Sequence, residues 1–457
     1  MIEFKFADFF YPGKLVRTYA LLRRSEHWSL EQFDTYQMKR LAPLLRFCAQ
    51  EVPYYASIFR QAGLKAQDIS SDNARQCLSR LPLLDKDTVR EQSDTLVARH
   101  VARFNPKPIT TSGTTGTPLT VYWDRDSNVM EFCSIQRFWR WAGFRIGQSF
   151  LDLRSRVFTE EDNHLVREQG VLYIRNWKVN GIELSSDYID ERNIHQYYEV
   201  LLRYTPRLVR GHPQAIQHLV SLLQEKHLDS WCPAVVTPTS ETLYEFQREQ
   251  MESAWQVPVM DSYGLKEHNV FIAQCCAGGY HIYPEYGICE IVDDDGNPVQ
   301  PGQEGWIVAT GLHTYAQPLL RYNTRDRAVA SHGRRCACGR TLPTVEHIVG
   351  RIDDCIYTHD GKRYSGMHFA FFGRRGIKKA RLVQEDLSKV QVELVVTSEF
   401  AQAEQAALRD ALERKVENRL TFEFRMVRDI VQENPGKFKF VVSRLKTEMR
   451  RNTPELN

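Results

Sequence analysis

The stretch from Thr110 to Leu119, TTSGTTGTPL, constrains this chain more than any other feature. It contains five threonines, two glycines and no charged residue. Two apolar segments border it, one approaching Ile109 and the other running from Leu119 to Trp123, and both predict β-strands. A surface turn needs one glycine or asparagine, so the density of small donors predicts a loop that wraps an oxyanion, above all a polyphosphate. A flexible connector is the alternative interpretation.

The loop is not a Walker P-loop. That pattern requires a lysine and a serine or threonine after its last glycine, whereas Thr117 and Pro118 follow Gly116. A nucleotide at this loop must therefore be bound without a lysine from the loop itself.

Composition excludes several classes of protein. With 60 basic and 57 acidic residues the net charge is +3, which gives no reason to expect a nucleic-acid partner. We find no signal peptide and no apolar run long enough to span a membrane. The ten cysteines are then expected to be thiols or metal ligands in a reducing cytoplasm. The sequence does not determine whether the protein is a monomer or a dimer.

The chain changes character three times along its length. The first hundred residues predict helices, with Ser29 and Gln32 in a capping box and one apolar face formed by Leu30, Phe33, Leu41, Leu44, Leu45 and Cys48. From about residue 104, short apolar strands alternate with helices. The strands are predicted at 149–155, 206–211 and 233–240, and helices follow the last two at 213–225 and 241–255. Residues 280–330 predict mostly strands, including two joined through an Asp-Gly turn in GICEIVDDDGNPV.

Beyond Gly350 the pattern predicts a strand–strand–helix–strand unit, which is enough for a small α+β domain. The fold class expected is α/β: a large N-terminal domain with a β-rich segment, residues 1–352, and a small mobile α+β domain, residues 353–457. Two domains of unequal size predict an active site between them that opens and closes.

The string TSGTTGTP resembles the phosphate-binding signature of the adenylate-forming superfamily, which includes acyl-CoA synthetases, peptide-synthetase adenylation domains and luciferases. Further elements resemble that family in its order along the chain: DSYGLKEHN (261–269), RYNTRDRA (321–328), GRIDD (350–354) and NPGKFKF (434–440). VPYY and LPLLDKDTVR (81–90) are similar to the phenylacetate–CoA ligase branch. CACGR (336–340), TPTSE (237–241) and YHIYPEYGICEI (280–291) resemble a subgroup found with capsular polysaccharide genes.

The resemblance implies roles for individual residues. Glu267 would hold Mg²⁺, Lys437 would stabilise the charge that builds on the α-phosphate, and Asp353 would be the hinge between domains. Lys266 departs from the family, which commonly has a threonine there. The implied nucleotide-binding set is Thr111, Ser112, Gly113, Thr114, Thr115, Gly116, Ser240, Glu241, Asp261, Tyr263, Gly264, Lys266, Asp326 and Arg351.

The resemblance also implies an activity. ATP and a carboxylic acid would give an acyl-adenylate and pyrophosphate, and the acyl group would pass to coenzyme A. Ligases that join aromatic or indole acids to amino acids are also similar, so an amine acceptor without coenzyme A stays open. A catalytically retired binding factor is the non-enzymatic alternative, and Lys266 is its best support.

The cysteines indicate a metal site. Cys336 and Cys338 form a tight pair before a glycine, and Cys275 and His281 can supply two further ligands, with Cys276 as the alternative to Cys275. Three cysteines and a histidine are a common structural zinc set. Some members of the family hold zinc here, which favours the same site in this chain.

Two further features have alternative interpretations. His212, before Pro213 at a predicted strand end, is either a hydrogen-bonded turn residue or a contact to the carboxylate substrate. Trp139, Trp141 and Phe144 either form aromatic core or line a pocket, and core is the interpretation we favour.

Overall fold

The computed structural model describes residues 12–110, 119–160, 162–168, 170–177, 179–351, 355–360, 362–364, 366–371, 374–430 and 439–445. The chain forms two compact units, each built from two separate stretches of sequence. The first unit comprises 1–146 and 262–348, and the second comprises 147–261 and 349–457. The predicted domain boundary at 352/353 lies outside the described residues, and it stays a prediction.

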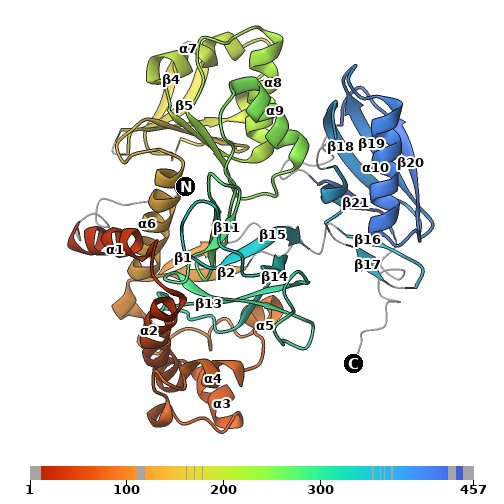
Figure 1. The fold of residues 1–457 in the computed structure, drawn as a ribbon. Coiled ribbons are helices and arrows are strands. Elements are labelled where there is room, and N and C mark those ends of the chain that lie inside the picture. Colours follow the sequence, from red (N-terminus) through yellow and green to blue (C-terminus); the bar gives the residue numbers. More distant parts are fainter. Residues whose placement is uncertain are drawn as a thin grey trace. The chain divides into compact units, whose positions relative to one another are not determined.

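The helices of the first unit are in its N-terminal stretch, as the apolar spacing predicts (Figure 1). The Ser29–Gln32 capping box is present at the start of the second helix. Five of the six residues predicted for its apolar face are buried, but Leu30 is 66% exposed, because as the first helical residue it points away from the core. These helices are α1 (Pro12–Ser25), α2 (Leu30–Glu51), α3 (Pro53–Gln61), η2 (Ala66–Asp68), α4 (Ala74–Ser79), α5 (Lys86–Glu91), η3 (Val101–Phe104) and α6 (Arg125–Trp141).

Two sheets complete the first unit. The strands predicted on either side of the Ser/Thr/Gly-rich loop form an antiparallel pair, β1 (Lys107–Thr110) and β2 (Thr120–Trp123). A seven-stranded sheet has the order β12-β13-β14-β15-β11-β10-β9. Its strands are β9 (Ser262–Gly264), β10 (Phe271–Gln274), β11 (Tyr280–Ile282), β12 (Gly287–Val292), β13 (Glu304–Gly311), β14 (Tyr322–Ala330) and β15 (Thr344–Arg351).

The Asp-Gly turn differs from the prediction. Its first strand, β12, is present, and Gly296 N–H closes the turn on Asp293 O at 3.1 Å. The second predicted strand is reduced to a single bridge between Val292 and Pro298, because proline has no N–H to donate to a ladder.

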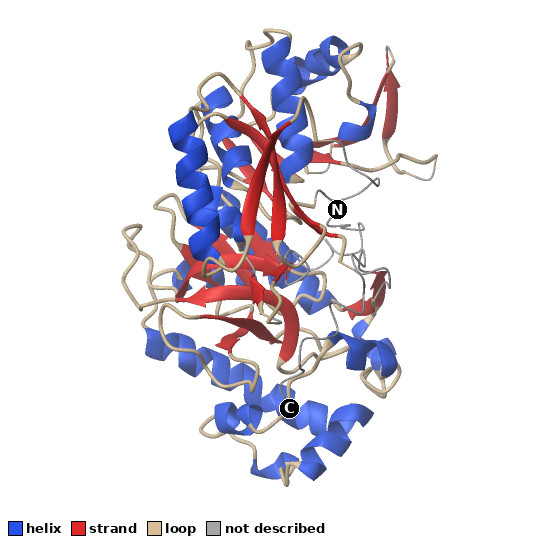
Figure 2. Ribbon diagram, turned by 90° about the vertical axis from the view of Figure 1, so that its right-hand side faces the viewer, coloured by secondary structure: helices blue, strands red, loops and turns tan. Residues whose placement is uncertain are grey.

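The second unit begins with a six-stranded sheet in the order β4-β5-β6-β3-β7-β8, whose four strands β6, β3, β7 and β8 run parallel. Helices pack on the apolar residues Leu151, Ile182 and Val209 of this sheet. Figure 2 shows the helices in blue and the strands in red. The elements are β3 (Phe150–Arg154), β4 (Leu165–Glu168), β5 (Val171–Asn176), β6 (Gly181–Ser185), η4 (Ser186–Tyr188), α7 (Ile194–Tyr204), β7 (Leu208–Gly211), α8 (Pro213–Glu225), β8 (Val235–Pro238) and α9 (Glu245–Trp255).

Helix α9 starts four residues later than the predicted 241. Ser240 has φ +73°, a left-handed conformation that ends strand geometry, and the side chain of Gln247 accepts from Tyr244 N–H at 3.1 Å at the true helix start. The predicted strands at 149–155, 206–211 and 233–240 are confirmed within one or two residues at each end.

The predicted strand–strand–helix–strand unit is confirmed at the end of the chain. A four-stranded sheet, β20-β19-β18-β21, carries α10, whose Leu408 and Leu412 are fully buried. The elements from residue 356 are β16 (Ile356–Tyr357), β17 (Arg363–Tyr364), η6 (Met367–Phe371), β18 (Ile377–Gln384), β19 (Lys389–Val396), α10 (Gln402–Lys415), β20 (Thr421–Met426) and β21 (Val441–Ser443).

Among the described helices we find none with both the length and the apolar character that a membrane crossing requires.

Candidate functional site

Two tyrosine–carboxylate hydrogen bonds join β9 and the segment that follows it to strand β14. Tyr263 Oη donates to Asp326 Oδ2 at 2.7 Å, and Tyr322 Oη donates to Glu267 Oε1 at 2.9 Å. In each segment the tyrosine and the carboxylate are four residues apart. Strands β15, β11 and β10 stand between β14 and β9 in the sheet order, so these bonds require the sheet to curl.

Burial determines whether the two tyrosine hydroxyls are ionised. Asp326 is 4% exposed and Glu267 is 9% exposed. Burial, and then the neighbouring Asp326 carboxylate, raise the pKa of Tyr263 well above its usual value. Burial and Glu267 raise the pKa of Tyr322 in the same way. Both phenols therefore stay protonated and donate to carboxylates, each of which has further lone pairs to offer to a ligand or cation.

Lys266 lies beside the strand that leads into the Ser/Thr/Gly-rich loop. Its ammonium donates to Thr110 O at 2.9 Å. Trp123, at the end of β2, donates its indole N–H to Lys266 O. The two ends of the loop's strand pair are thus tied to the segment that carries Tyr263 and Glu267, which positions an ammonium next to the loop.

The segment LPLLDKDTVR lies along β14 on the side of the candidate site. Leu84 N–H donates to Arg321 O and Asn323 N–H donates to Leu84 O, both at 2.9 Å. The Arg321 guanidinium donates to Leu81 O at 3.0 Å. Arg325, next to Asp326, forms an ion pair with Asp87. These contacts hold the strand that carries Asp326.

Left-handed backbone occurs beside three of the candidate residues. Ser240, His268 and Arg325 have φ of +73°, +51° and +63°. Each precedes or follows a carboxylate of the implied set, namely Glu241, Glu267 or Asp326. Non-glycine residues adopt this conformation at a cost, and such positions concentrate at functional sites.

The second unit brings two of its predicted residues together. His212 Nδ1 lies 3.7 Å from Glu241 Oε1, with side-chain exposures of 17% and 9%. His212 is placed by the preceding glycine: Gly211 has φ +152°, and a Cβ there would lie 1.8 Å from Leu153 O. Ser240 and Asp261 belong to the same unit.

The four predicted metal ligands lie together in the first unit. Cys275, His281, Cys336 and Cys338 have their ligand atoms within 4.8 Å of one another. Cys275 Sγ is 3.5 Å from Cys336 Sγ, and Cys338 Sγ is 3.3 Å from His281 Nε2. Ligand atoms around tetrahedral zinc are separated by about 3.5 Å, given Zn–S near 2.3 Å and Zn–N near 2.0 Å. Cys276, the alternative, is exposed.

The surroundings of this Cys/His cluster leave space for an ion. A Cβ at Gly279 would lie 2.8 Å from Cys336 Sγ and 3.6 Å from His281 Nε2, so only glycine fits beside the sulfur. Leu342 O lies 3.3 Å from His281 Nδ1, where it accepts if that nitrogen carries the proton and leaves Nε2 as a ligand. Burial lowers the pKa of His281, which favours the neutral ring that binds metal.

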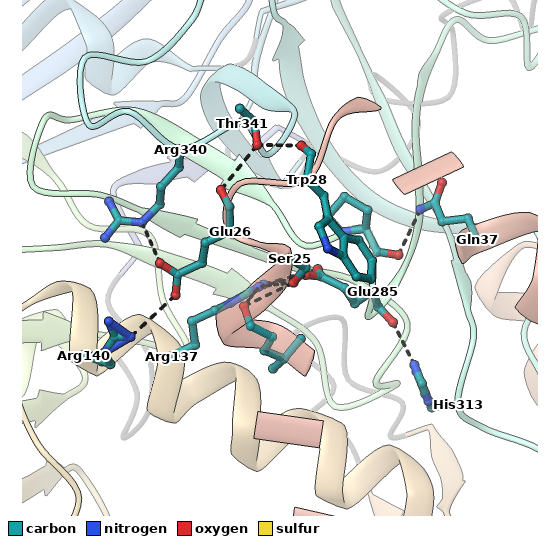
Figure 3. Close-up of polar contacts among 12 residues, drawn as sticks. Ser25, Glu26, Trp28, Gln37, Arg137, Arg140, Glu285, His313, Arg340 and Thr341 are labelled. Carbon is teal, nitrogen blue, oxygen red and sulfur yellow. Dashed lines mark hydrogen bonds and ion pairs between the residues drawn. The ribbon is translucent and has the colours of Figure 1, made fainter. Parts of the chain in front are cut away.

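A buried charged network joins α1 and α6 to the turn before β12 (Figure 3). Arg137 and Glu285 are both 0% exposed and form a two-point ion pair with distances of 2.9 and 3.3 Å. Ser25 also donates to Glu285, and the Arg137 guanidinium lies 3.7 Å from the Tyr283 ring centre. Glu26 forms an ion pair with Arg340, close to the Cys/His cluster, with an N···O distance of 3.5 Å. The favoured core interpretation of the nearby aromatics is confirmed, since Trp139, Trp141 and Phe144 are buried.

Several predicted site residues lie outside the described residues. These are Asp353 and Lys437, and the side chain of Arg351, together with the loop residues Thr111, Ser112, Gly113, Thr114, Thr115 and Gly116. The sequence analysis also missed Tyr322, the partner of Glu267. Its signal was the spacing of four residues to Asp326, which repeats the spacing from Tyr263 to Glu267.

Comparison with known proteins finds relatives over most of the chain. Residues 356–444 match the model of the CapK C-terminal domain. Protein CapK of Staphylococcus aureus is 20% identical over 415 residues, covering 90% of this chain and 89% of that protein. Phenylacetate-coenzyme A ligase of Thermus thermophilus is 25% identical over 337 residues, covering 71% and 72%. The Escherichia coli enzyme of the same name is 25% identical over 348 residues, covering 72% and 73%.

Solved structures share the fold. The crystal structure of 2-hydroxyisobutyryl-CoA ligase in the postadenylation state matches with a TM-score of 0.71 at 18% identity, over 94% of this chain and 93% of that one. At that identity the match establishes the fold alone. Over most of its length the chain is similar to the phenylacetate–CoA ligases and to protein CapK, and its last domain matches the CapK C-terminal domain.

Proposed function

We propose that the protein is an AMP-forming carboxylate ligase that converts an acid and ATP into an acyl-adenylate and pyrophosphate, and then transfers the acyl group to coenzyme A. The observation that carries this proposal is the crossed pair of bonds from Tyr263 to Asp326 and from Tyr322 to Glu267. It fixes two buried carboxylates on segments that resemble the nucleotide site of the family. The phenylacetate-coenzyme A ligases among its relatives support the same reaction.

In this proposal the residues have separate tasks. Asp326 accepts hydrogen bonds from the ribose hydroxyls, and Tyr263 packs against the adenine. Glu267 would hold Mg²⁺ through a hard carboxylate oxygen, and the ion would screen the charge of the phosphates. Lys266, held next to the loop by Thr110 O, adds a point charge on the phosphate side. Attack by the substrate carboxylate on the α-phosphate displaces pyrophosphate, and the loop's donors stabilise the developing charge.

An exchange assay tests the activity. ATP–pyrophosphate exchange across aromatic, hydroxy and amino acids reports adenylation without reference to the acceptor. Adding coenzyme A or amino acids to the accepted acid then separates the thioester product from an amide. Release of ADP in place of pyrophosphate, or exchange with no acid at all, would contradict the proposal.

Replacing Asp326 by asparagine should raise KM for ATP at least about tenfold in this assay. A charged acceptor contributes about 1.5–3 kcal/mol per hydrogen bond, and 1.4 kcal/mol corresponds to a factor of ten. The asparagine keeps the size of the side chain and its bond from Tyr263, so folding should be retained. The exposed Asp72→Asn is the matched control and should leave KM unchanged. Equal KM values for ATP in the two variants would show that Asp326 does not bind the nucleotide.

The Cys/His cluster supports a second proposal, that Cys275, His281, Cys336 and Cys338 hold one structural zinc. The donor set and the separations of 3.3 and 3.5 Å fit a closed tetrahedral site. The ion would join the β10–β11 turn to the loop before β15, and it would take no part in the acyl chemistry.

Replacing Cys338 by serine should lower the zinc content and the melting temperature before it lowers activity, because structural metal binding is coupled to folding. The exposed Cys276→Ser, one residue from a proposed ligand, should keep both at the wild-type value. Metal analysis of protein purified without chelator should find about one zinc per chain, and less than about a tenth of an equivalent would contradict the proposal.

A further inference from the structure

Two consecutive residues after Glu267 have buried polar atoms without a protein partner. His268 is 4% exposed and Asn269 is 1% exposed. Within the part of the chain that the structure describes, His268 Nδ1 and both amide atoms of Asn269 make no hydrogen bond. A buried polar group left unpaired destabilises the fold, so each such group needs a partner other than the surrounding protein.

The fold holds both residues rigidly in place. The His268 ring stacks on Trp123, with centroids 4.1 Å apart and an interplanar angle of 16°, and its φ is +51°. Gly287 and Gly311, which pair across β12 and β13, make room for the backbone of Asn269. A Cβ on Gly287 would lie 2.1 Å from Asn269 O, and a Cβ on Gly311 would lie 3.2 Å from Asn269 Cα. The ring of His268 and the backbone of Asn269 are therefore both closely confined by their neighbours.

A third unpaired group belongs to a residue that is bonded to strand β2. Gln317 is 2% exposed, and its Oε1 accepts from Tyr122 N–H at 3.0 Å. Its Nε2 has no partner among the described residues. Tyr122 directly precedes Trp123, so β2 connects Gln317 to the residue that stacks on His268. The three side chains offer donors and acceptors of hydrogen bonds but no charge.

The unpaired side chains favour an uncharged ligand group. Burial lowers the pKa of His268 to about 3, so its ring is neutral at physiological pH. An asparagine amide and a neutral imidazole together satisfy a hydroxyl, which both donates and accepts. A second carboxylate would need a cation, and neither His268 nor Asn269 supplies one.

We propose that His268 and Asn269 are specificity residues that bind a hydroxyl group on the organic part of the acid that the enzyme activates. The inference rests on the proposed carboxylate-ligase function, in which Glu267, the residue directly before His268, belongs to the reaction centre. It deepens that function by naming the substrate class: hydroxylated carboxylic acids, in preference to apolar acids of the same shape.

The test compares acids that differ only in a hydroxyl and a methyl group. The probes are 2-hydroxyisobutyrate with pivalate, and 4-hydroxyphenylacetate with 4-methylphenylacetate, in ATP–pyrophosphate exchange. The full-length wild type should favour the hydroxyl member of one pair at least about a hundredfold in kcat/KM, because a site built to bind a hydroxyl is left unpaired by the methyl acid.

Asn269→Leu should reduce that preference at least about tenfold by lowering kcat/KM for the hydroxy acid and sparing the methyl acid. Its melting temperature should not fall, because leucine replaces an unpaired amide with an apolar group of similar size. Asn269→Ala serves the same purpose if the leucine variant does not fold. Asn176→Leu is the matched control, since Asn176 Oδ1 is also buried without a partner, and it should leave the preference unchanged.

The outcomes separate the two proposals. Exchange that is equally fast with both members of each pair would overturn the hydroxyl subsite and leave the ligase function standing, and would mean that ordered water partners these groups. A preference that survives Asn269→Leu would also overturn it. Exchange with none of the four acids, when another acid of the panel supports it, would overturn the subsite alone, and exchange with no acid of either set would contradict the ligase function and the subsite together.

Discussion

Replacing Lys437 by alanine should slow acyl-adenylate formation about a hundredfold or more, of order 3 kcal/mol, while acyl transfer from a synthetic acyl-adenylate continues at nearly the wild-type rate. The reason is that an ammonium delivered to the α-phosphate stabilises charge only while the carboxylate attacks. The measurement is single-turnover kinetics of each half-reaction. Lys437 is outside the described residues, so this prediction rests on the resemblance of NPGKFKF to the family's C-terminal element.

Two further variants sharpen this result. Lys439→Ala changes the neighbouring lysine of the same element and should leave both half-reactions unchanged. Asp353→Pro should do the reverse of Lys437→Ala, because a fixed φ at the proposed hinge blocks the second arrangement while the adenylation arrangement can still form. If the Lys437 and Asp353 variants lose both half-reactions to the same extent, the protein does not use alternating domain positions.

Replacing Arg137 by methionine should lower the free energy of unfolding by about 3–5 kcal/mol, the largest stability effect that we expect from any single substitution. The change leaves Glu285, which is 0% exposed, as a buried carboxylate without its two-point partner (Figure 3). It also removes the bond from the guanidinium to Leu22 O, which ties α1 to α6. Denaturant unfolding measures the loss.

The matched control is Arg75→Met. Arg75 and Asp34 form an ion pair at 2.6 Å, but both side chains are more than half exposed, so its loss should cost about 0–1 kcal/mol. The double variant Arg137→Met with Glu285→Leu should recover much of the stability, because no buried charge is left without a partner. Similar losses from Arg137→Met and Arg75→Met would show that the buried pair contributes no more than a surface pair.

Local features of the sequence were sufficient for most of the helices and strands. The capping box at Ser29, the strand pair around the Ser/Thr/Gly-rich loop and the final strand–strand–helix–strand unit depend on periodicity and on neighbours within a few residues. The spacing of Cys336 and Cys338 in the sequence also predicts that the two thiols lie close together. Local signals failed at Leu30 and at the start of α9, where the direction of one side chain or one backbone angle decided the outcome.

The hydrogen-bond partners in the candidate nucleotide site could not be predicted from the local sequence. The resemblance named Tyr263, Glu267 and Asp326 separately, but it did not reveal that Tyr263 bonds to Asp326, 63 residues away, or that Tyr322 bonds to Glu267. Those pairs depend on how the seven-stranded sheet curls, which is set by the register of strands that do not follow one another in the chain.

The sequence by itself determined the fold class, the strand-bordered loop and the close pair Cys336 and Cys338, because each follows from the spacing of residue types along the chain. Cys275 lies beside Cys336, 61 residues away in the chain, only in the folded protein. Only the tertiary structure decided which side chains are buried together. Arg137 and Glu285 are 148 residues apart, and nothing in their neighbours predicts that each is the other's partner. The unpaired amide of Asn269 is likewise a property of the packed interior, since a hydrogen-bond partner is absent or present only once every surrounding element is in place.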